Sequence, residues 1–247
     1  MGRLGEPRDV WSGATLDDFP SYIAAAHELK SPLVLMRQLS LMLEDGGLDD
    51  NEQKRMLRQI SLTSERALRL TSDLTRTARL DGELFGLEPI NPVVLCEEIV
   101  RELSPLFTAR DRELRLISRH HAPHLILANR DLLRRVIMNF SDNALNYADE
   151  YSSIDIIISS LDYGSSVRLG VRDYGPAVPA GMIKSIDKDK LMHSRNLVQA
   201  RPQSSGLGIF IASQFAKAMN GKIGVTKHRD GATFYIDLQT SHQLSLL

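Results

Sequence analysis

The chain is short of cysteine, of long apolar runs and of net charge. Its 247 residues include one cysteine, Cys96, which excludes an internal disulfide bond and fits a reducing compartment. No uninterrupted apolar run approaches the roughly 20 residues that span a bilayer, since even the stretch from Pro32 to Leu43 contains Arg37 and Gln38. The 30 basic and 31 acidic residues leave a formal charge of -1, which predicts no general attraction for nucleic acid or for anionic membranes.

The N-terminal third of the chain has a helical pattern. The first residues lack the apolar middle and the cleavage pattern of a secretory signal, and residues 1–17 are expected to form a tail or linker. Apolar residues spaced by three and four predict one helix that ends near Leu43 and a second that includes Met56. A polar turn joins them, so an antiparallel hairpin is predicted over 18–82. Its apolar face is too wide for one neighbour, which favours a homodimer that closes a four-helix bundle.

Residues 83–240 mix helical and strand-like patterns. Helices are predicted at 93–107, 131–148 and 205–219, and strands at 114–117, 125–127, 154–160, 167–171, 222–226 and 232–238. This order predicts an α+β sandwich, with helices on one face of a mostly antiparallel or mixed sheet. The expected fold is therefore multidomain, an all-α hairpin followed by an α+β sandwich, with residues 241–247 as a C-terminal tail.

Three asparagines lie together beside the apolar face of the helix predicted at 131–148. They are Asn139, Asn143 and Asn146, spaced by four and three residues. Asparagine is an indifferent helix former, so this cluster is unusual on propensity grounds. It could supply neutral oxygen ligands for a hard cation that is held mainly by phosphates. The alternative interpretation is a solvated helix face.

Two further segments suit a ligand site. Asp173 follows a predicted strand and precedes a tight turn at Gly175, where its carboxylate could accept a hydrogen bond from an exocyclic amine. The alternative is a turn aspartate that bonds its own backbone. Gly206 and Gly208 stand at a predicted helix start, where bare N–H groups and the helix dipole favour an anion. Many helices begin at glycines, so this segment alone is a weak indication.

Taken in order, the motifs resemble those of sensor histidine kinases. HELKSPL at 27–33, NxxxNAxxY at 139–147, DxGP at 173–176 and SGLGI at 205–209 are similar to the H, N, G1 and G2 boxes of that family. The likeness covers nearly the whole chain. It implies a dimerisation and phosphoacceptor hairpin followed by an ATP-binding domain of the GHKL ATPase type.

The resemblance also implies an activity and its catalytic residues. The family carries out ATP-dependent autophosphorylation of a histidine and then transfers the phosphoryl group to an aspartate in the receiver domain of a response regulator. The resemblance assigns His27 as the phosphoacceptor. It assigns Glu28 as the acceptor of a hydrogen bond from the other ring nitrogen of His27. Ser31 would position water for a response-regulator phosphatase activity.

ATP and Mg²⁺ are the cofactors that the resemblance implies. It assigns coordination of Mg²⁺ to Asn139 and Asn143, adenine stacking to Tyr147 and recognition of the adenine amine to Asp173. The remaining nucleotide-binding residues expected from the boxes are Asn146, Gly175, Ala177, Gly206, Leu207 and Gly208.

Three positions depart from the family pattern. Ala177 stands where glycine is usual, Ser204 replaces the first glycine of the G2 box, and Asn146 replaces a common lysine. These changes suggest a weaker or specialised kinase. The alternative function is a non-catalytic dimeric scaffold, or a phosphatase-only module with a degenerate nucleotide site. We expect a cytoplasmic location, as a free protein or as the cytoplasmic portion of a membrane-anchored one, with an upstream sensor domain or partner supplying the signal.

Overall fold

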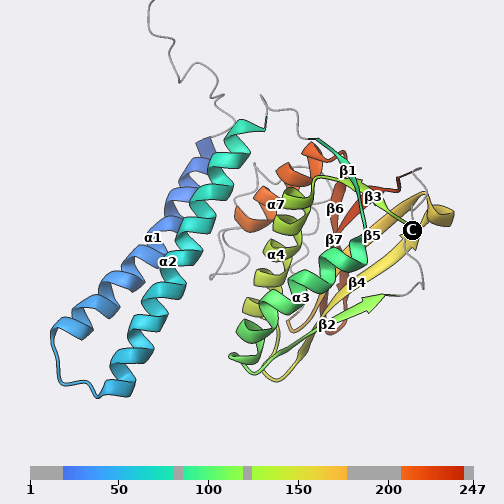
Figure 1. The fold of residues 1–247 in the computed structure, drawn as a ribbon. Coiled ribbons are helices and arrows are strands. Elements are labelled where there is room, and N and C mark those ends of the chain that lie inside the picture. Colours follow the sequence, from blue (N-terminus) through green and yellow to red (C-terminus); the bar gives the residue numbers. More distant parts are fainter. Residues whose placement is uncertain (1–18, 81–85, 119–123, 177–206, 242–247) are drawn as a thin grey trace, which may run out of the picture.

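The computed structural model describes residues 19–80, 86–118, 124–176 and 207–241, with the backbone alone for residues 19–24 and for His27. These residues form a helical hairpin and an α/β domain that lie side by side (Figure 1). Within the described residues, no helix combines the length and the apolar character that a membrane crossing requires. Two expected ligand residues, Ala177 and Gly206, lie outside the described residues.

The hairpin consists of α1 (Phe19–Glu44) and α2 (Asp50–Arg79), which run antiparallel as predicted (Figure 1). α1 continues through Pro32. α2 begins at a capping box, in which Asp49 Oδ1 accepts the backbone N–H of Glu52 at 2.8 Å. The Glu52 carboxylate in turn accepts the backbone N–H of Asp49 at 3.2 Å. These reciprocal bonds satisfy N–H groups that the helix itself leaves unpaired, and they fix the point where the chain reverses.

The α/β domain contains a mixed sheet, a short second sheet and three helices among the described residues. The helices are α3 (Pro92–Thr108), α4 (Arg130–Tyr147) and α7 (Leu207–Ala218). The main sheet has the order β2-β4-β5-β7-β6, with bounds Glu113–Ser118, Ser153–Leu161, Ser166–Tyr174, Gly231–Gln239 and Lys222–His228. β2 pairs parallel with β4, and the other neighbours are antiparallel. A short 3₁₀ turn, η2 (Asp162–Gly164), joins β4 to β5, and β1 (Glu88–Ile90) pairs with β3 (Ile126–Ala128).

The core of this domain lies between the main sheet and the layer of three helices (Figure 1). Every second residue of a strand points to the same face, and in β5 this face carries buried Val167, Leu169 and Val171. α4 fills the other side of the core with residues three and four apart, such as Ile137 and Phe140, which are fully buried. The predicted sandwich, with its helices on one face of the sheet, is confirmed.

The opposite face of the sheet carries paired charges, and the described helices lie on the other side. Arg168 donates two hydrogen bonds to the carboxylate of Asp237, each at 2.7 Å, and its guanidinium lies 3.5 Å from the centre of the Tyr235 ring. Asp155, which is buried, accepts hydrogen bonds from Arg115 at 2.8 Å and from the Tyr174 hydroxyl at 2.9 Å. Paired in this way, the charged groups keep their hydrogen bonds on a face that none of the described helices covers.

The end of the hairpin near Ala25 packs against the helical layer of the domain. Ala25 of α1 is only 7% exposed and belongs to the same apolar cluster as the domain core. Leu70 and Leu74 of α2 pack against this cluster, and both hairpin helices contact α7. Because Ala25 precedes His27 by two residues, the segment of α1 that carries His27 lies at this junction.

Candidate active site

α4 presents Asn139 and Asn143 one turn apart on the side where it packs against α7. The Nδ2 atoms of both amides are buried, and neither has a hydrogen-bond partner among the described residues. A buried amide without a partner costs about 1–3 kcal/mol, and such groups are rare in native proteins unless a ligand or water satisfies them. Each side chain can offer Nδ2 to a phosphate oxygen and Oδ1 to a cation.

The start of α7 lies beside these asparagines. A Cβ atom on Gly208 would lie 3.9 Å from Oδ1 of Asn139, so the backbone of the first turn of α7 is next to α4. Leu207, the first residue of α7, is 2% exposed, and its buried side chain anchors the helix start. The positive end of the α7 dipole therefore lies near two amide Nδ2 atoms that no described residue pairs, which favours a negatively charged ligand there.

Asp173 lies inside β5, one residue before its end, and does not follow the strand as the sequence pattern indicated. It is 2% exposed, and its Oδ1 accepts the backbone N–H of Ala232 in β7 at 2.9 Å. The alternative interpretation, a turn aspartate that bonds its own backbone, places Asp173 in a turn, whereas the residue lies in a strand and its carboxylate bonds a neighbouring strand. The carboxylate is held by a strand that lies 59 residues further along the chain.

The turn between β6 and β7 completes this end of the sheet. Gly231 has φ +132°, and a Cβ atom there would lie 2.7 Å from Oδ1 of Asp173. Sequence reasoning missed this glycine, although the dipeptide Asp230-Gly231 between two strands is a known turn signal. Arg172 donates a hydrogen bond to Asp230 at 2.6 Å, which lowers the pKa of Asp230 below its ordinary value and fixes the turn.

The C-terminal ends of α4 and β5 are tied together. The backbone N–H of Asp149 donates to the carbonyl oxygen of Tyr174 at 2.8 Å, and the N–H of Gly175 donates to that of Asp230 at 3.2 Å. Tyr147, the last residue of α4, is half-buried beside this contact. The structure thus brings the segments around Asn143, Asp173 and Gly208 to one side of the domain.

The other expected site residues are placed differently. Asn146 accepts a hydrogen bond from Arg110 at 3.4 Å, so its amide is engaged by the loop that follows α3. Glu28, half-buried, and Ser31, exposed, lie on the continuous helix α1. The side chain of His27 lies outside the described residues, and its expected contact with Glu28 stays a prediction.

Two family models match the chain. Residues 24–83 match the His Kinase A (phospho-acceptor) domain, and residues 128–242 match the histidine kinase-, DNA gyrase B- and HSP90-like ATPase. The first covers the hairpin, and the second covers α4, α7 and the strands that carry Asp173 and Gly231. Together they span more than half of the chain.

Curated relatives match most of the chain. The histidine protein kinase SaeS of Staphylococcus epidermidis is 28% identical over 221 residues, which are 87% of this chain and 61% of SaeS. The swarming motility regulation sensor protein RssA of Serratia marcescens is 30% identical over 227 residues, which are 89% of this chain and 46% of RssA. The chain thus spans less than two thirds of the length of either relative.

A solved structure shares the fold. The histidine kinase ThkA, determined in complex with the response regulator protein TrrA, matches with a TM-score of 0.61 at 18% identity, over 87% of this chain and 60% of the ThkA chain. At this identity the likeness concerns the fold alone. The order of the two matched domains, the curated relatives and this fold lead to one conclusion: the chain belongs to the sensor histidine kinases.

Proposed function

We propose that the protein phosphorylates His27 at the expense of ATP and passes the phosphoryl group to an aspartate of a response regulator receiver domain. The observation that carries this proposal is the pair of buried Nδ2 atoms of Asn139 and Asn143 near the start of α7, for which the described residues supply no hydrogen-bond partner. Groups of this kind cost stability unless a ligand satisfies them. The phosphates of a nucleotide fit both the amides and the helix dipole.

Each side of the site has a role in binding the nucleotide. Asn139 and Asn143 would hold Mg²⁺ through Oδ1, and the ion would neutralise charge on the phosphates when it is bound. The backbone at Gly208 would lie along the phosphates. Asp173 is held rigidly through Ala232, so it suits the adenine amine, which donates hydrogen bonds to a fixed acceptor. Stacking of Tyr147 on adenine remains part of this proposal.

The proposed reaction proceeds in two balanced transfers. A neutral ring nitrogen of His27 attacks the γ-phosphorus, a P–N bond forms, and the bond from the γ-phosphorus to the bridging oxygen breaks so that ADP leaves. Glu28 would accept a hydrogen bond from the other ring nitrogen and stabilise the charge that develops on the ring. The receiver aspartate then takes the phosphoryl group, the P–N bond breaks, and His27 is regenerated. Ser31 is proposed to support a phosphatase activity, which removes the phosphoryl group from the response regulator.

We also propose that the hairpin forms a homodimer. Seven large apolar side chains of the hairpin are exposed in the single chain, at 43 to 67% of their surface, and these are Leu33, Val34, Leu41, Met42, Leu57, Leu62 and Leu68. An apolar face of this extent is typical of a helix that packs against a partner. In solution we expect a mass of twice 27.6 kDa by light scattering, and a monomer for a variant that combines Leu57→Glu with Leu62→Glu.

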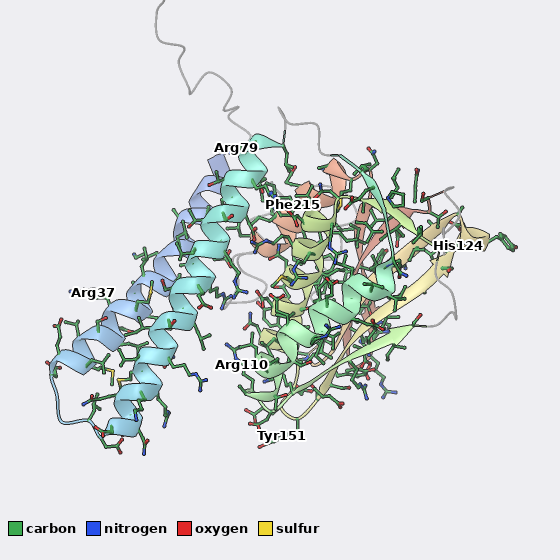
Figure 2. All side chains as sticks on the ribbon, in the orientation of Figure 1. Arg37, Arg79, Arg110, His124, Tyr151 and Phe215 are labelled. Carbon is green, nitrogen blue, oxygen red and sulfur yellow. The ribbon has the colours of Figure 1, made fainter. Side chains whose placement is uncertain are left out.

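The phosphorylation proposal is tested with γ-labelled ATP and Mg²⁺. We expect label that is lost in acid and stable in alkali, which is the signature of a phosphoramidate. His27→Gln should abolish the label. His124→Gln is the matched control, because His124 is exposed and lies on the side of the domain away from the hairpin (Figure 2). It should label like the unmodified protein.

Three outcomes separate the candidate functions. Label that persists in His27→Gln would contradict His27 as the acceptor. Failure of the unmodified protein to label while it still binds Mg-ATP would favour the scaffold or phosphatase function, which can be assayed with a phosphorylated receiver domain. Failure to bind any adenosine nucleotide would contradict the assignment of the site itself.

A further inference from the structure

α2 and α4 face each other through two stripes of charged residues. The stripe on α2 contains Arg66, Arg69, Asp73 and Arg76. The stripe on α4 contains Asp131, Arg135, Met138 and Asp142. In both helices the spacing of three and four places these residues on one side, and each stripe extends about 15 Å along its axis.

The stripes contact each other with opposite signs. Arg76 Nη2 lies 3.4 Å from Asp131 Oδ2, and Arg135 Nε lies 3.3 Å from Asp73 Oδ1. Because positions 76 and 73 meet positions 131 and 135 in that order, the two helices run antiparallel.

The order of signs specifies one alignment of the helices. A slip of one turn in one direction would set Asp73 against Asp131 and Arg69 against Arg135. A slip in the other direction would set Arg76 against Arg135. Either slip places like charges together, which is unfavourable, most of all where water is scarce. The Asp73 side chain is only 8% exposed, so its pairing with Arg135 is the most protected contact in the stripe.

The contact between the two stripes does not exclude water. A cavity of about 310 Å³ lies along it, and its lining includes Arg69, Arg76, Arg135 and Met138. The apolar contacts near Leu70 and Leu74 lie on the same stretch of α2. Apolar packing between the hairpin and the α/β domain is not directional, whereas the order of the charges distinguishes one alignment from another.

The stripe lies next to the residues of the candidate site. On α4, Arg135 precedes Asn139 by one turn, and Asp142 directly precedes Asn143. On the hairpin side, the same junction contains Ala25, two residues before His27. The alignment of α4 on α2 therefore decides where the asparagines lie relative to the His27 segment.

We infer that the Asp73–Arg135 and Arg76–Asp131 pairs set the register in which the nucleotide-binding domain docks on the hairpin, and that Asp73 and Arg135 are positioning residues for phosphoryl transfer to His27. This inference rests on the proposed function. A displacement of one helical turn moves the donor by about 5 Å, which is far outside the tolerance of an in-line transfer. Register therefore acts on the rate of transfer and leaves nucleotide binding unchanged.

Charge exchange tests this inference. Asp73→Arg and Arg135→Asp should each lower the rate of His27 labelling at saturating ATP by about tenfold or more. The dissociation constant for ATP should stay within about twofold of the original. The combination of Asp73→Arg with Arg135→Asp restores opposite signs in the same place and should recover most of the rate. Asp45→Arg, at the exposed turn of the hairpin, is the matched control and should have no effect.

A second measurement reports docking without any chemistry. Spin labels on cysteines introduced at Gln59 and Tyr151, both exposed and outside the proposed dimer face, give the distance between α2 and the domain, with labelled chains diluted in unlabelled protein. We expect a narrow distribution in the unmodified and double-exchange proteins and a broad or shifted one in each single variant. Equal distributions in all four, or a double exchange that binds ATP but recovers neither distance nor rate, would overturn the inference. If His27 is never labelled but the distances are as expected, the proposed function and the role of these residues in transfer are contradicted. The docking register is still supported in that case.

Discussion

Gly175 lies against the backbone that ends α4: a Cβ atom at this position would overlap the carbonyl oxygen of Tyr147 and lie 3.2 Å from the Cα atom of Ala148. The close approach joins the strand that carries Asp173 to the helix that carries Asn139 and Asn143. Only a residue without a side chain permits it. The glycine therefore sets the separation of the two walls of the candidate site.

Gly175→Ala is expected to push β5 away from α4. The neighbouring atoms belong to backbone and cannot rotate aside, so overpacking should lower the free energy of unfolding by about 1–3 kcal/mol. It should also weaken binding of a fluorescent ATP analogue, measured by titration. Gly86→Ala is the matched control, because a Cβ atom there meets nothing within 4 Å. Equal stability and equal affinity in the two variants would show that the contact at Gly175 is not tight.

Asn143→Ala is expected to separate binding from stability. Its buried Nδ2 has no partner among the described residues, so its removal should leave the melting temperature unchanged or raise it slightly. Affinity for Mg-ATP should fall by about tenfold or more, since the variant loses a proposed ligand of the cation. Calorimetry measures both quantities on one sample. A large loss of stability in nucleotide-free protein would mean that the amide has a structural role instead.

Cys96 is expected to resist thiol reagents while the domain is folded. It is fully buried in α3, and burial raises its pKa to about 12, so almost no thiolate exists at neutral pH. Because it is the single cysteine of the chain, Ellman's reagent should react at a rate set by unfolding, and with one equivalent in denaturant. Fast reaction in buffer would show that α3 opens locally.

Asp73 is expected to make stability depend on pH in a defined direction. Burial raises the pKa of Asp73, and Arg135, Arg76 and Arg69 offset this shift only in part, with Asp142 adding to it. Ionised Asp73 therefore destabilises the folded protein at any pH above its raised folded-state pKa. This cost disappears as the pH falls from the folded-state pKa to the lower pKa of the unfolded chain. Asp73→Asn should be more stable at pH 7 by less than about 1 kcal/mol, given solvent screening.

The matching measurement is urea unfolding of both proteins at pH 7 and in mild acid. The difference between their free energies of unfolding should shrink in acid. An Asp73→Asn variant that is less stable than the original protein at pH 7, with a deficit that disappears in acid, would mean that the ion pair with Arg135 outweighs desolvation. If Asp73 positions the domains as inferred, the more stable variant should also transfer phosphate more slowly.

Local signals explain why most elements were predictable. Asn91 and Pro92 mark the start of α3 in the sequence, and the helix begins at Pro92, with the Asn91 side chain accepting N–H groups of its first turn. The hairpin of β4 and β5 follows from alternating apolar residues around Asp162-Tyr163-Gly164. Such signals lie within a few residues of what they specify.

The contacts that define the site are of another kind. Nothing near Asp173 indicates that its partner is the N–H of Ala232, because β7 reaches β5 only when the sheet is assembled. The pairing of Asp73 with Arg135 is equally hidden, since each belongs to a helix face that looks solvated when taken alone. The role of His27 came from resemblance to a family and not from local pattern.

The position of β7 between β5 and β6 has a consequence during synthesis on the ribosome. Until Gly231 to Gln239 have emerged, β5 is an unprotected edge strand, and the carboxylate of Asp173 lacks the Ala232 N–H that holds it. If Asp173 recognises the adenine as proposed, a nascent chain that has already completed both hairpin helices and α4 cannot yet bind a nucleotide in this way. Chains that stop before β7 present an aggregation-prone edge to the cell's quality control.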